Sequence, residues 1–384
     1  MQKDFHYYAL YYLSLCAGIE PDTAYKIAYS SQYVDDSTES DKIWLLDKRG
    51  KKGFIDPVRT AHNGLESFWK DVWEKIYYPF HFVPGHKKGS KDEQIKDEKY
   101  IDKDEKYITK EGKSNQIATE YLKKALKTED PYRIGIALHP YADTYSHQNF
   151  SGRWSGVNNV EKMHVYVRNL RRKKLKLKLI LSFYNLFRRP IPEIGHAEAV
   201  MVPDISNYSW VYFNYKNEYV PAANEERFLS YAENVYEHIL CKIGKKWRTE
   251  KEEIPFDTIK DKIEQGIYRD GSLKKKCRYW TGLISKKLSS KKIRKYDKYE
   301  WRKQALKGKI KWDKRKHLDQ KRIAMVPKED FLESHWLKFH RAALGHRIEA
   351  LGILLDHELI PKKTYDEVKK KIVAEWDGKK IDPI

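Results

Sequence analysis

The feature that most constrains the fold is a nine-residue segment, residues 139–147, in which potential metal ligands recur at every fourth position: His139, Asp143 and His147. The preceding residues 132–138 are strongly apolar, and Asp130 followed by Pro131 is typical of a helix start, so we predict a buried helix. Residues four apart lie on one face of a helix. The fold must therefore provide partners for three polar groups in its interior.

The same spacing limits how these residues can bind a metal. A helix rises 1.5 Å per residue, so His139 and His147 are separated by about 12 Å along its axis, whereas a zinc–ligand bond is about 2 Å long. The two histidines cannot hold one ion, and Asp143 between them is placed to bridge two. A kink at Pro140 would change this geometry. The alternative is a buried helix whose histidines are satisfied by backbone carbonyl groups.

The composition favours a globular, mostly helical protein. The chain has 384 residues and 40% hydrophobic content, which is enough for a sizeable core. Leu, Lys, Glu, Ala and Tyr recur with helical periodicity, and we identify no valine-rich alternating runs. We predict an all-α fold, a multi-helix bundle forming a single domain over residues 1–384. Its expected additions are an exposed charged insertion at 87–113 and a basic peripheral region at 245–325.

The net charge is the strongest global signal. The 76 Lys and Arg against 55 Asp and Glu give +21, which exceeds what solubility requires and suggests a polyanionic partner or substrate. Nucleic acid and anionic phospholipid both qualify, and the 28 Tyr and 11 Trp offer stacking faces for single-stranded nucleic acid. The alternative is that the aromatic residues form the core and the lysines reflect only a lysine-rich surface.

The segments that would suggest secretion or membrane insertion are not found in the sequence. Three scattered cysteines indicate neither a disulfide scaffold nor a cysteine-based zinc module. The first residues lack a signal-peptide pattern, and no run approaches the roughly 18 apolar residues of a membrane span, so we expect a soluble, cytoplasmic protein. Residues 170–189 have basic ends and an apolar middle. This segment is expected to lie on an anionic membrane, to bind phosphate, or to pack as an ordinary helix or strand.

Further candidate ligands lie at the ends of expected helices. His6 begins an aromatic segment, the Asp35-Asp36 pair ends the next helix, and His62 precedes another. Gly195 before His196 permits the close backbone approach that metal loops use. The candidate set, with Glu198 and Asp204 in reserve, is His6, Asp35 or Asp36, His62, His139, Asp143, His147 and His196.

Imidazole and carboxylate donors suit Zn, Fe, Mn or Ni rather than a thiolate site, and this set is large enough for two or three ions. His81, between aromatic residues, is expected in the core or in a supporting position. Four histidines in the C-terminal segment 335–357 do not share one helical face, so core packing is the better interpretation for them.

Several common catalytic motifs are missing from the sequence: HExxH, paired CxxC, GxxxxGK[ST], GxSxG and an adjacent His-Asp dipeptide. The order of the candidate ligands resembles that of the zinc-dependent phospholipase C and S1/P1 nuclease superfamily. Five stretches are more closely similar to an uncharacterised bacterial family, a domain of unknown function: DFHYY, AYSSQYVDD, HPYADTYSHQNFSG, GHAEA followed by PD, and FHRAALGHR.

The superfamily resemblance implies an all-helical fold with a trinuclear zinc site. Carried over by position, it implies a first zinc held by four residues: Asp36 (or Asp35), His62, His139 and Asp143. Asp143 would also bridge to a second zinc near His6, and His147 with His196 would hold a third.

Two features depart from the superfamily pattern. The superfamily uses the N-terminal amine of a processed chain as a ligand, and this sequence shows no leader to remove. It also places a carboxylate four residues after its last histidine, where this chain has Val200. Glu198 or Asp204 would have to substitute in the third site.

These observations predict a metal-dependent phosphodiester hydrolase with two or three zinc ions, or other divalent transition metals, as cofactors. Such ions lower the pKa of water and stabilise charge on phosphoryl oxygens. Asp35 or Asp36, whichever is not a ligand, is the expected general base beside Asp143. Nucleic acid is favoured as substrate over lipid. The alternatives are a phospholipase C that contacts the membrane through 170–189, and a non-enzymatic helical nucleic-acid-binding protein.

Overall fold

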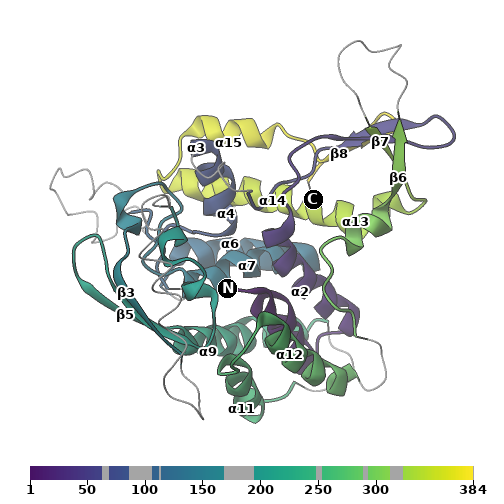
Figure 1. Cartoon of the computed structure of the whole chain (residues 1–384). Helices are drawn as coiled ribbons and strands as arrows, with labels where there is room; N and C mark the ends of the chain where they lie inside the picture. The colour runs from purple at the N-terminus through teal and green to yellow at the C-terminus, as the bar shows by residue number, and fades with distance from the viewer. Residues whose placement is uncertain are drawn as a thin grey trace.

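The computed structural model places helices at the centre of the molecule and two β-sheets on different sides of it (Figure 1). The structure describes residues 1–62, 69–85, 106–111, 114–167, 194–247, 253–288, 293–311 and 323–383. The predicted interfacial segment 170–189 lies outside these ranges, as does most of the predicted insertion 87–113.

The predicted buried helix is α7 (Pro131–Ser146), the central element of the fold (Figure 1). Asp130 caps it by accepting a hydrogen bond from the backbone N–H of Tyr132, as its sequence suggests. The helix continues through Pro140 to Ser146. It packs against α2 (Pro21–Asp36), α4 (Tyr78–Phe80), α6 (Gln116–Thr128), α9 (Asn224–Val235) and α14 (His335–Asp356).

A glycine sets the distance between α7 and α2. A Cβ atom at Gly135 would lie 2.2 Å from the carbonyl oxygen of Ile27, which no side chain tolerates. The two backbones therefore approach closely, and this approach brings the C-terminal end of α2, with Asp35, beside the face of α7 that carries His139 and Asp143.

The remaining helices surround this centre. The N-terminal segment forms η1 (Asp4–Ala9) and α1 (Leu10–Cys16), which pack against α2. The other helical elements that bear on the argument are α3 (Lys70–Val72), η3 (Trp73–Tyr77), α4 (Tyr78–Phe80), η6 (Ala197–Ala199), η7 (Val202–Asp204), η8 (Tyr236–Leu240), α10 (Cys241–Gly244), α11 (Phe256–Ile267), α12 (Leu273–Leu288), α13 (Glu300–Ala305) and α15 (Lys362–Lys369). The region predicted as basic periphery contains α11 to α13, whose Trp280 and Trp301 are fully buried.

The all-α prediction is wrong, because the chain also forms two sheets. One has six strands in the order β6-β7-β1-β2-β8-β9, and the other has three in the order β3-β4-β5. Their bounds are β1 (Ile43–Leu46), β2 (Lys52–Ile55), β3 (Glu161–Val167), β4 (Tyr208–Phe213), β5 (Tyr219–Ala223), β6 (Leu306–Lys311), β7 (Ile323–Pro327), β8 (Ala374–Trp376) and β9 (Lys379–Ile381).

The physical reason for the error differs between the strands. In β3 the buried Met163 and Val165 alternate with the exposed Lys162, His164 and Tyr166, which is a period-two pattern that the sequence does contain. The strands β8 and β9 have three residues each, too few to show a period. Strand β1 pairs with β7 in parallel from a distant part of the chain, and no local pattern reports such pairing.

The three-stranded sheet supports the C-terminal end of α7. Trp210 and Tyr212 on β4 stack on Phe150, just beyond this helix. The Trp210 indole donates a hydrogen bond to the side chain of Asn224, whose amide group donates in turn to the Val202 carbonyl. Together these contacts fix η7, the turn that ends at Asp204.

Among the described residues, no helix is long and apolar enough to cross a membrane. The longest of these helices, α14, carries histidines that pack in the core, as the sequence predicts. His340 Nδ1 accepts a hydrogen bond from the backbone N–H of Val58, and His346 Nε2 donates to the carbonyl of Pro79. Burial lowers the pKa of each from 6.5 to about 3.

These neutral histidines predict a pH-dependent stability. Below pH 6.5 the unfolded chain binds a proton at each histidine that the folded chain does not bind. Stability is therefore fully present above pH 6.5 and is lost as the pH falls towards about 3, by about 1.4 kcal/mol per pH unit for each histidine. We expect His346→Gln, whose amide can still donate to Pro79, to remove one such contribution in urea unfolding between about pH 6 and pH 4.5. His238→Gln at an exposed position is the control, and equal slopes for the two variants would contradict the prediction.

Candidate metal centre

Histidine and aspartate side chains gather around Asp143 in three groups. Within each group, one potential ligand atom from each residue lies within 4.8 Å of those of the others. The groups are His6, His139 and Asp143; Asp35, His81 and His139; and His147, His196 and Asp204. Because His139 belongs to two of them and Asp143 contacts members of all three, they form one connected centre.

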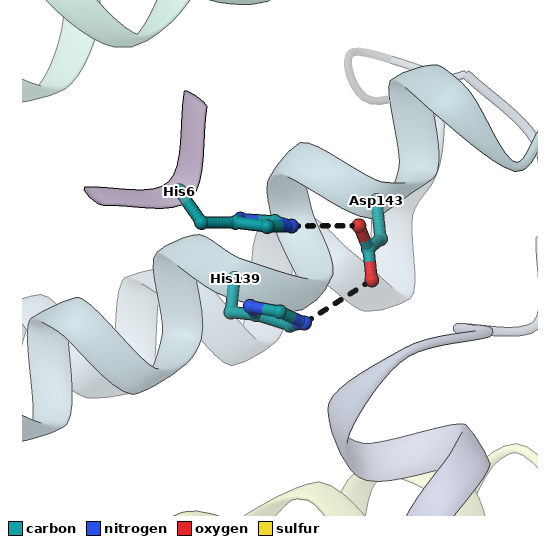
Figure 2. A group of neighbouring side chains, drawn as sticks. All are labelled: His6, His139 and Asp143. Atoms are coloured by element: carbon teal, nitrogen blue, oxygen red, sulfur yellow. Dashed lines mark hydrogen bonds and ion pairs between the residues drawn. The ribbon is translucent and has the colours of Figure 1, made fainter. Parts of the chain in front are cut away.

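The first group places the Asp143 carboxylate between two imidazoles (Figure 2). Its Oδ1 lies 3.2 Å from His6 Nε2, and its Oδ2 lies 3.3 Å from His139 Nε2. The two rings are stacked with centroids 3.9 Å apart. His6 comes from η1 and the other two residues from α7, so each carboxylate oxygen faces a different element. This is the arrangement that a bridging carboxylate requires.

The second group brings together two imidazole nitrogens and two carboxylate oxygens. His139 Nε2 lies 3.4 Å from Asp35 Oδ1 and 3.2 Å from His81 Nδ1. His81 Nδ1 lies 3.5 Å from Asp143 Oδ2 and 3.9 Å from Asp35 Oδ1. Four donor atoms of mixed N and O type thus converge on one point, and four is the usual coordination number of zinc in proteins.

The third group is built around Asp204. Its two oxygens lie 2.9 Å from His147 Nε2 and 3.3 Å from His196 Nε2. Asp204 therefore supplies the carboxylate that the sequence left open between Glu198 and Asp204. Glu198 instead accepts a hydrogen bond from the backbone N–H of Val160, at the start of the three-stranded sheet.

Main-chain carbonyl groups fix the tautomers of three of these histidines. A carbonyl oxygen only accepts hydrogen bonds, so the ring nitrogen that faces it carries the proton. These bonds run from His139 Nδ1 to Ser31, from His81 Nε2 to Thr60 and from His196 Nδ1 to Val200, at 2.8, 2.8 and 2.7 Å.

A neutral imidazole carries one proton, so the second nitrogen of each of these rings carries a lone pair. In all three histidines this second nitrogen faces a carboxylate. A lone pair and a carboxylate repel each other unless a cation or a proton lies between them. Metal-binding histidines show the same arrangement, with one nitrogen donating to a carbonyl and the other directed at the ion. Backbone carbonyls therefore satisfy only one of the two nitrogens in each ring.

The buried carboxylate of Asp143 and the partly buried ones of Asp35 and Asp204 also require positive charge. Burial alone would raise the pKa of Asp143, but His147, the Met1 amino group and His139 hold it well below its usual value. Asp204 is likewise held low, against burial, by the amino group and by His196. Asp35 differs, because burial raises its pKa. Three carboxylates so close together are stable only with cations among them.

The amino group of Met1 lies inside the centre. It is 2.7 Å from Asp143 Oδ1, 3.0 Å from Asp204 Oδ1 and 3.2 Å from the hydroxyl of Ser146. Burial alone would lower its pKa, but the two carboxylates raise it to about 11. In this structure the ammonium group supplies one positive charge to the centre, and in its neutral form it offers a further nitrogen donor.

Two predicted residues lie outside the three groups. The Asp36 carboxylate accepts hydrogen bonds from the Tyr296 hydroxyl at 2.6 Å and from the Gln32 amide at 3.2 Å. Of the aspartate pair, only Asp35 reaches the centre. His62 lies on the wall of the adjoining cavity, hydrogen-bonded to Tyr77.

His81 is the candidate ligand that sequence reasoning missed. It follows the Tyr-Tyr-Pro-Phe stretch at the end of α4, where an aromatic environment suggests a core position. The helix runs through Pro79 to Phe80 and ends just before His81, and no local pattern in the sequence distinguishes this position from a core position. His62 and His81 are both single histidines beside aromatic helices, and only the folded chain distinguishes them.

A cavity of about 430 Å³ opens onto the centre. Its walls include members of all three groups, together with apolar side chains such as Phe82 and Ile194. The donor atoms are therefore accessible to a ligand from one direction while the helices bury them from the others.

A model of a protein family of unknown function, DUF6765, matches residues 1–354, and the chain belongs to this family. The predicted similarity to an uncharacterised family is thereby confirmed. The matched residues include every member of the three groups. A search of the curated proteins and a search of the solved structures each found no match.

The shared position of Asp143 predicts how metal stoichiometry responds to substitution. Asp143→Asn weakens all three groups, so we expect it to lose more than one equivalent of zinc, whereas Asp204→Asn should lose only the ion of the third group. Zinc at about a hundredfold excess over its Kd should stabilise the wild type by about 2.7 kcal/mol for each ion bound, and Asp143→Asn should lose most of this gain.

Metal analysis after dialysis and thermal melts with added zinc measure these two effects. The matched control is Asp36→Asn, which changes a neighbouring carboxylate outside the groups. If Asp143→Asn and Asp36→Asn bind the same amount of metal as the wild type, the three groups are not metal sites.

Proposed function

We propose that this protein is a metal-dependent phosphodiester hydrolase that uses a cluster of divalent ions, with zinc as the favoured metal. The observation that carries the proposal is that imidazoles with carbonyl-fixed tautomers converge with one buried carboxylate, Asp143, and two partly buried ones, Asp35 and Asp204, beside one open cavity. A purely structural histidine cluster has no reason to direct its lone pairs at carboxylates. The donor set of imidazole nitrogen and carboxylate oxygen suits zinc without any thiolate.

The three groups define which residues would hold the ions. Asp35, His81, His139 and Asp143 Oδ2 would form one site. His6, Asp143 Oδ1 and the Met1 amino group would form a second, and His147, His196 and Asp204 a third. The order of these residues along the chain resembles that of the phospholipase C and S1/P1 nuclease superfamily, with His81 at the position that the sequence comparison gave to His62.

When bound, divalent ions supply Lewis acidity towards phosphoryl oxygens and lower the pKa of water towards neutrality. The chain itself holds the ligand side chains in position. Asp143 and His139 stay in register because both lie on α7, which is buried along almost its whole length. Asp35 lines the cavity whereas Asp36 is held by Tyr296, so Asp35 is the member of the pair that serves the centre, either as a ligand or as the acceptor of the proton of the attacking water.

The net charge of +21 favours a polyanionic substrate, and nucleic acid is our first candidate. One observation favours phospholipid as the second. Val200 and Met201, which follow His196 beside the cavity, are 46% and 54% exposed. Exposed apolar side chains next to a catalytic opening are typical of enzymes that act at a lipid surface.

Activity measurements separate these candidates. The zinc-loaded protein should be incubated with single-stranded DNA, with RNA and with phospholipid vesicles, and the products compared with those of Asp143→Asn. We expect one substrate class to be cleaved, and we expect the substitution to reduce the rate at least about a hundredfold. A metal-loaded protein that cleaves none of the three, or activity that survives Asp143→Asn, would overturn the proposal. Nucleic-acid binding without cleavage would support the non-enzymatic alternative.

A further inference from the structure

The cavity wall contains a polar pair that belongs to none of the three metal groups. His62 Nε2 and the hydroxyl of Tyr77 are hydrogen-bonded to each other, and their rings meet edge to face with centroids 4.9 Å apart. Both residues line the cavity that opens onto the metal centre. The pair therefore faces the volume that a substrate would occupy.

Helix geometry directs Tyr77 towards the centre. Tyr77 ends η3, and the backbone N–H of His81 donates to its carbonyl at 2.8 Å, so the helical turn continues from one residue to the other. Residues four apart project from the same face of a helix. The two rings lie 6.3 Å apart and nearly perpendicular, and the His81 ring contacts Asp143. Tyr77 is thus beside the second metal group.

Main-chain hydrogen bonds hold His62 in place. The backbone N–H groups of Thr60 and Ala61 both donate to the carbonyl of Ser37, and the Thr60 hydroxyl donates to that of Val34. The Thr60 carbonyl also accepts the hydrogen bond from His81. The residues before His62 are therefore hydrogen-bonded both to the end of α2 and to His81, a candidate metal ligand. These bonds leave the pair of His62 and Tyr77 little freedom to move.

The chemistry of the pair suits a phosphoryl group. The Tyr77 side chain is buried, and this burial raises its pKa, so the phenol keeps its proton at any physiological pH. A neutral, fixed O–H donor beside a cluster of cations complements the negative charge that develops on phosphoryl oxygens during hydrolysis. The adjoining Phe82 and Ile194 are apolar and exclude competing water.

We propose that the Tyr77 hydroxyl donates a hydrogen bond to a non-bridging oxygen of the phosphodiester substrate, and that His62 is a positioning residue which holds the phenol in orientation through its Nε2–H. This assignment rests on the proposed hydrolase function. It gives His62 a role in substrate binding that does not require it to contact a metal.

The test uses the full-length, zinc-loaded protein. Tyr77→Phe removes only the hydroxyl, so metal content should equal that of the wild type and stability should fall by no more than about 1 kcal/mol, the contribution of its hydrogen bond to His62, while kcat/KM falls about a hundredfold. Tyr279→Phe is the matched control, because the Tyr279 hydroxyl also donates a hydrogen bond, to the Lys262 carbonyl, but lies outside the cavity lining. His62→Leu should lose about tenfold, and His62→Gln, which can still donate to the phenol, should recover most of that loss.

A sulfur substitution in the substrate identifies the contact itself. Sulfur accepts hydrogen bonds poorly, so replacing the non-bridging oxygen should slow the wild type more than it slows Tyr77→Phe. If Tyr77→Phe has wild-type kcat/KM, or if the sulfur effect is the same in both proteins, the assignment of Tyr77 is wrong although the hydrolase proposal stands. An inactive but metal-loaded wild type would instead overturn both.

Discussion

The burial of the Asp143 carboxylate is the constraint on which the rest of the structure depends. Its side chain is 1% exposed, and the groups within 4 Å of it come from the N-terminus, η1, the end of α4 and α7 itself. A buried carboxylate costs several kcal/mol unless charge or hydrogen bonds compensate it. Four imidazoles surround it, but in the neutral form of two of them, His81 and His139, the only proton lies on the nitrogen that a carbonyl group holds, so the nitrogen that faces Asp143 has none to donate. Cations shared by several ligands resolve the conflict, and this is why we interpret the cluster as a metal centre.

The fold supplies what such a centre needs from distant parts of the chain. Gly135 lets α2 approach α7, so that Asp35 and the Ser31 carbonyl reach His139. The three-stranded sheet, through Trp210 and Asn224, fixes the turn that carries Asp204. These elements contribute few ligands by themselves, but each one places a ligand or the acceptor that orients it. The three-stranded sheet, which the sequence did not predict, is therefore part of the support of the site rather than an addition to a helical bundle.

The sequence was sufficient for the features that depend on local periodicity. The start of α7, its burial and the central position of Asp143 follow from an apolar run and a spacing of four. The choice between Asp35 and Asp36 depends on the rotation of the last turn of α2 against Tyr296. The choice between His62 and His81 depends on the partner of each ring, which is the Tyr77 hydroxyl for His62 and the Thr60 carbonyl for His81. Both are tertiary properties. The strand β3 could have been predicted from its alternation, whereas β8 and β9 are too short to carry a pattern.

Anomalous diffraction tests the central claim most directly. Crystals of the zinc-loaded protein should be measured on both sides of the zinc absorption edge. We expect anomalous peaks on both sides of the Asp143 carboxylate, one between Asp35, His81 and His139 and one beside His6, together with a third at His147, His196 and Asp204. The absence of any peak within bonding distance of Asp143, with His81 and His139 still directed at bare carboxylates, would contradict it.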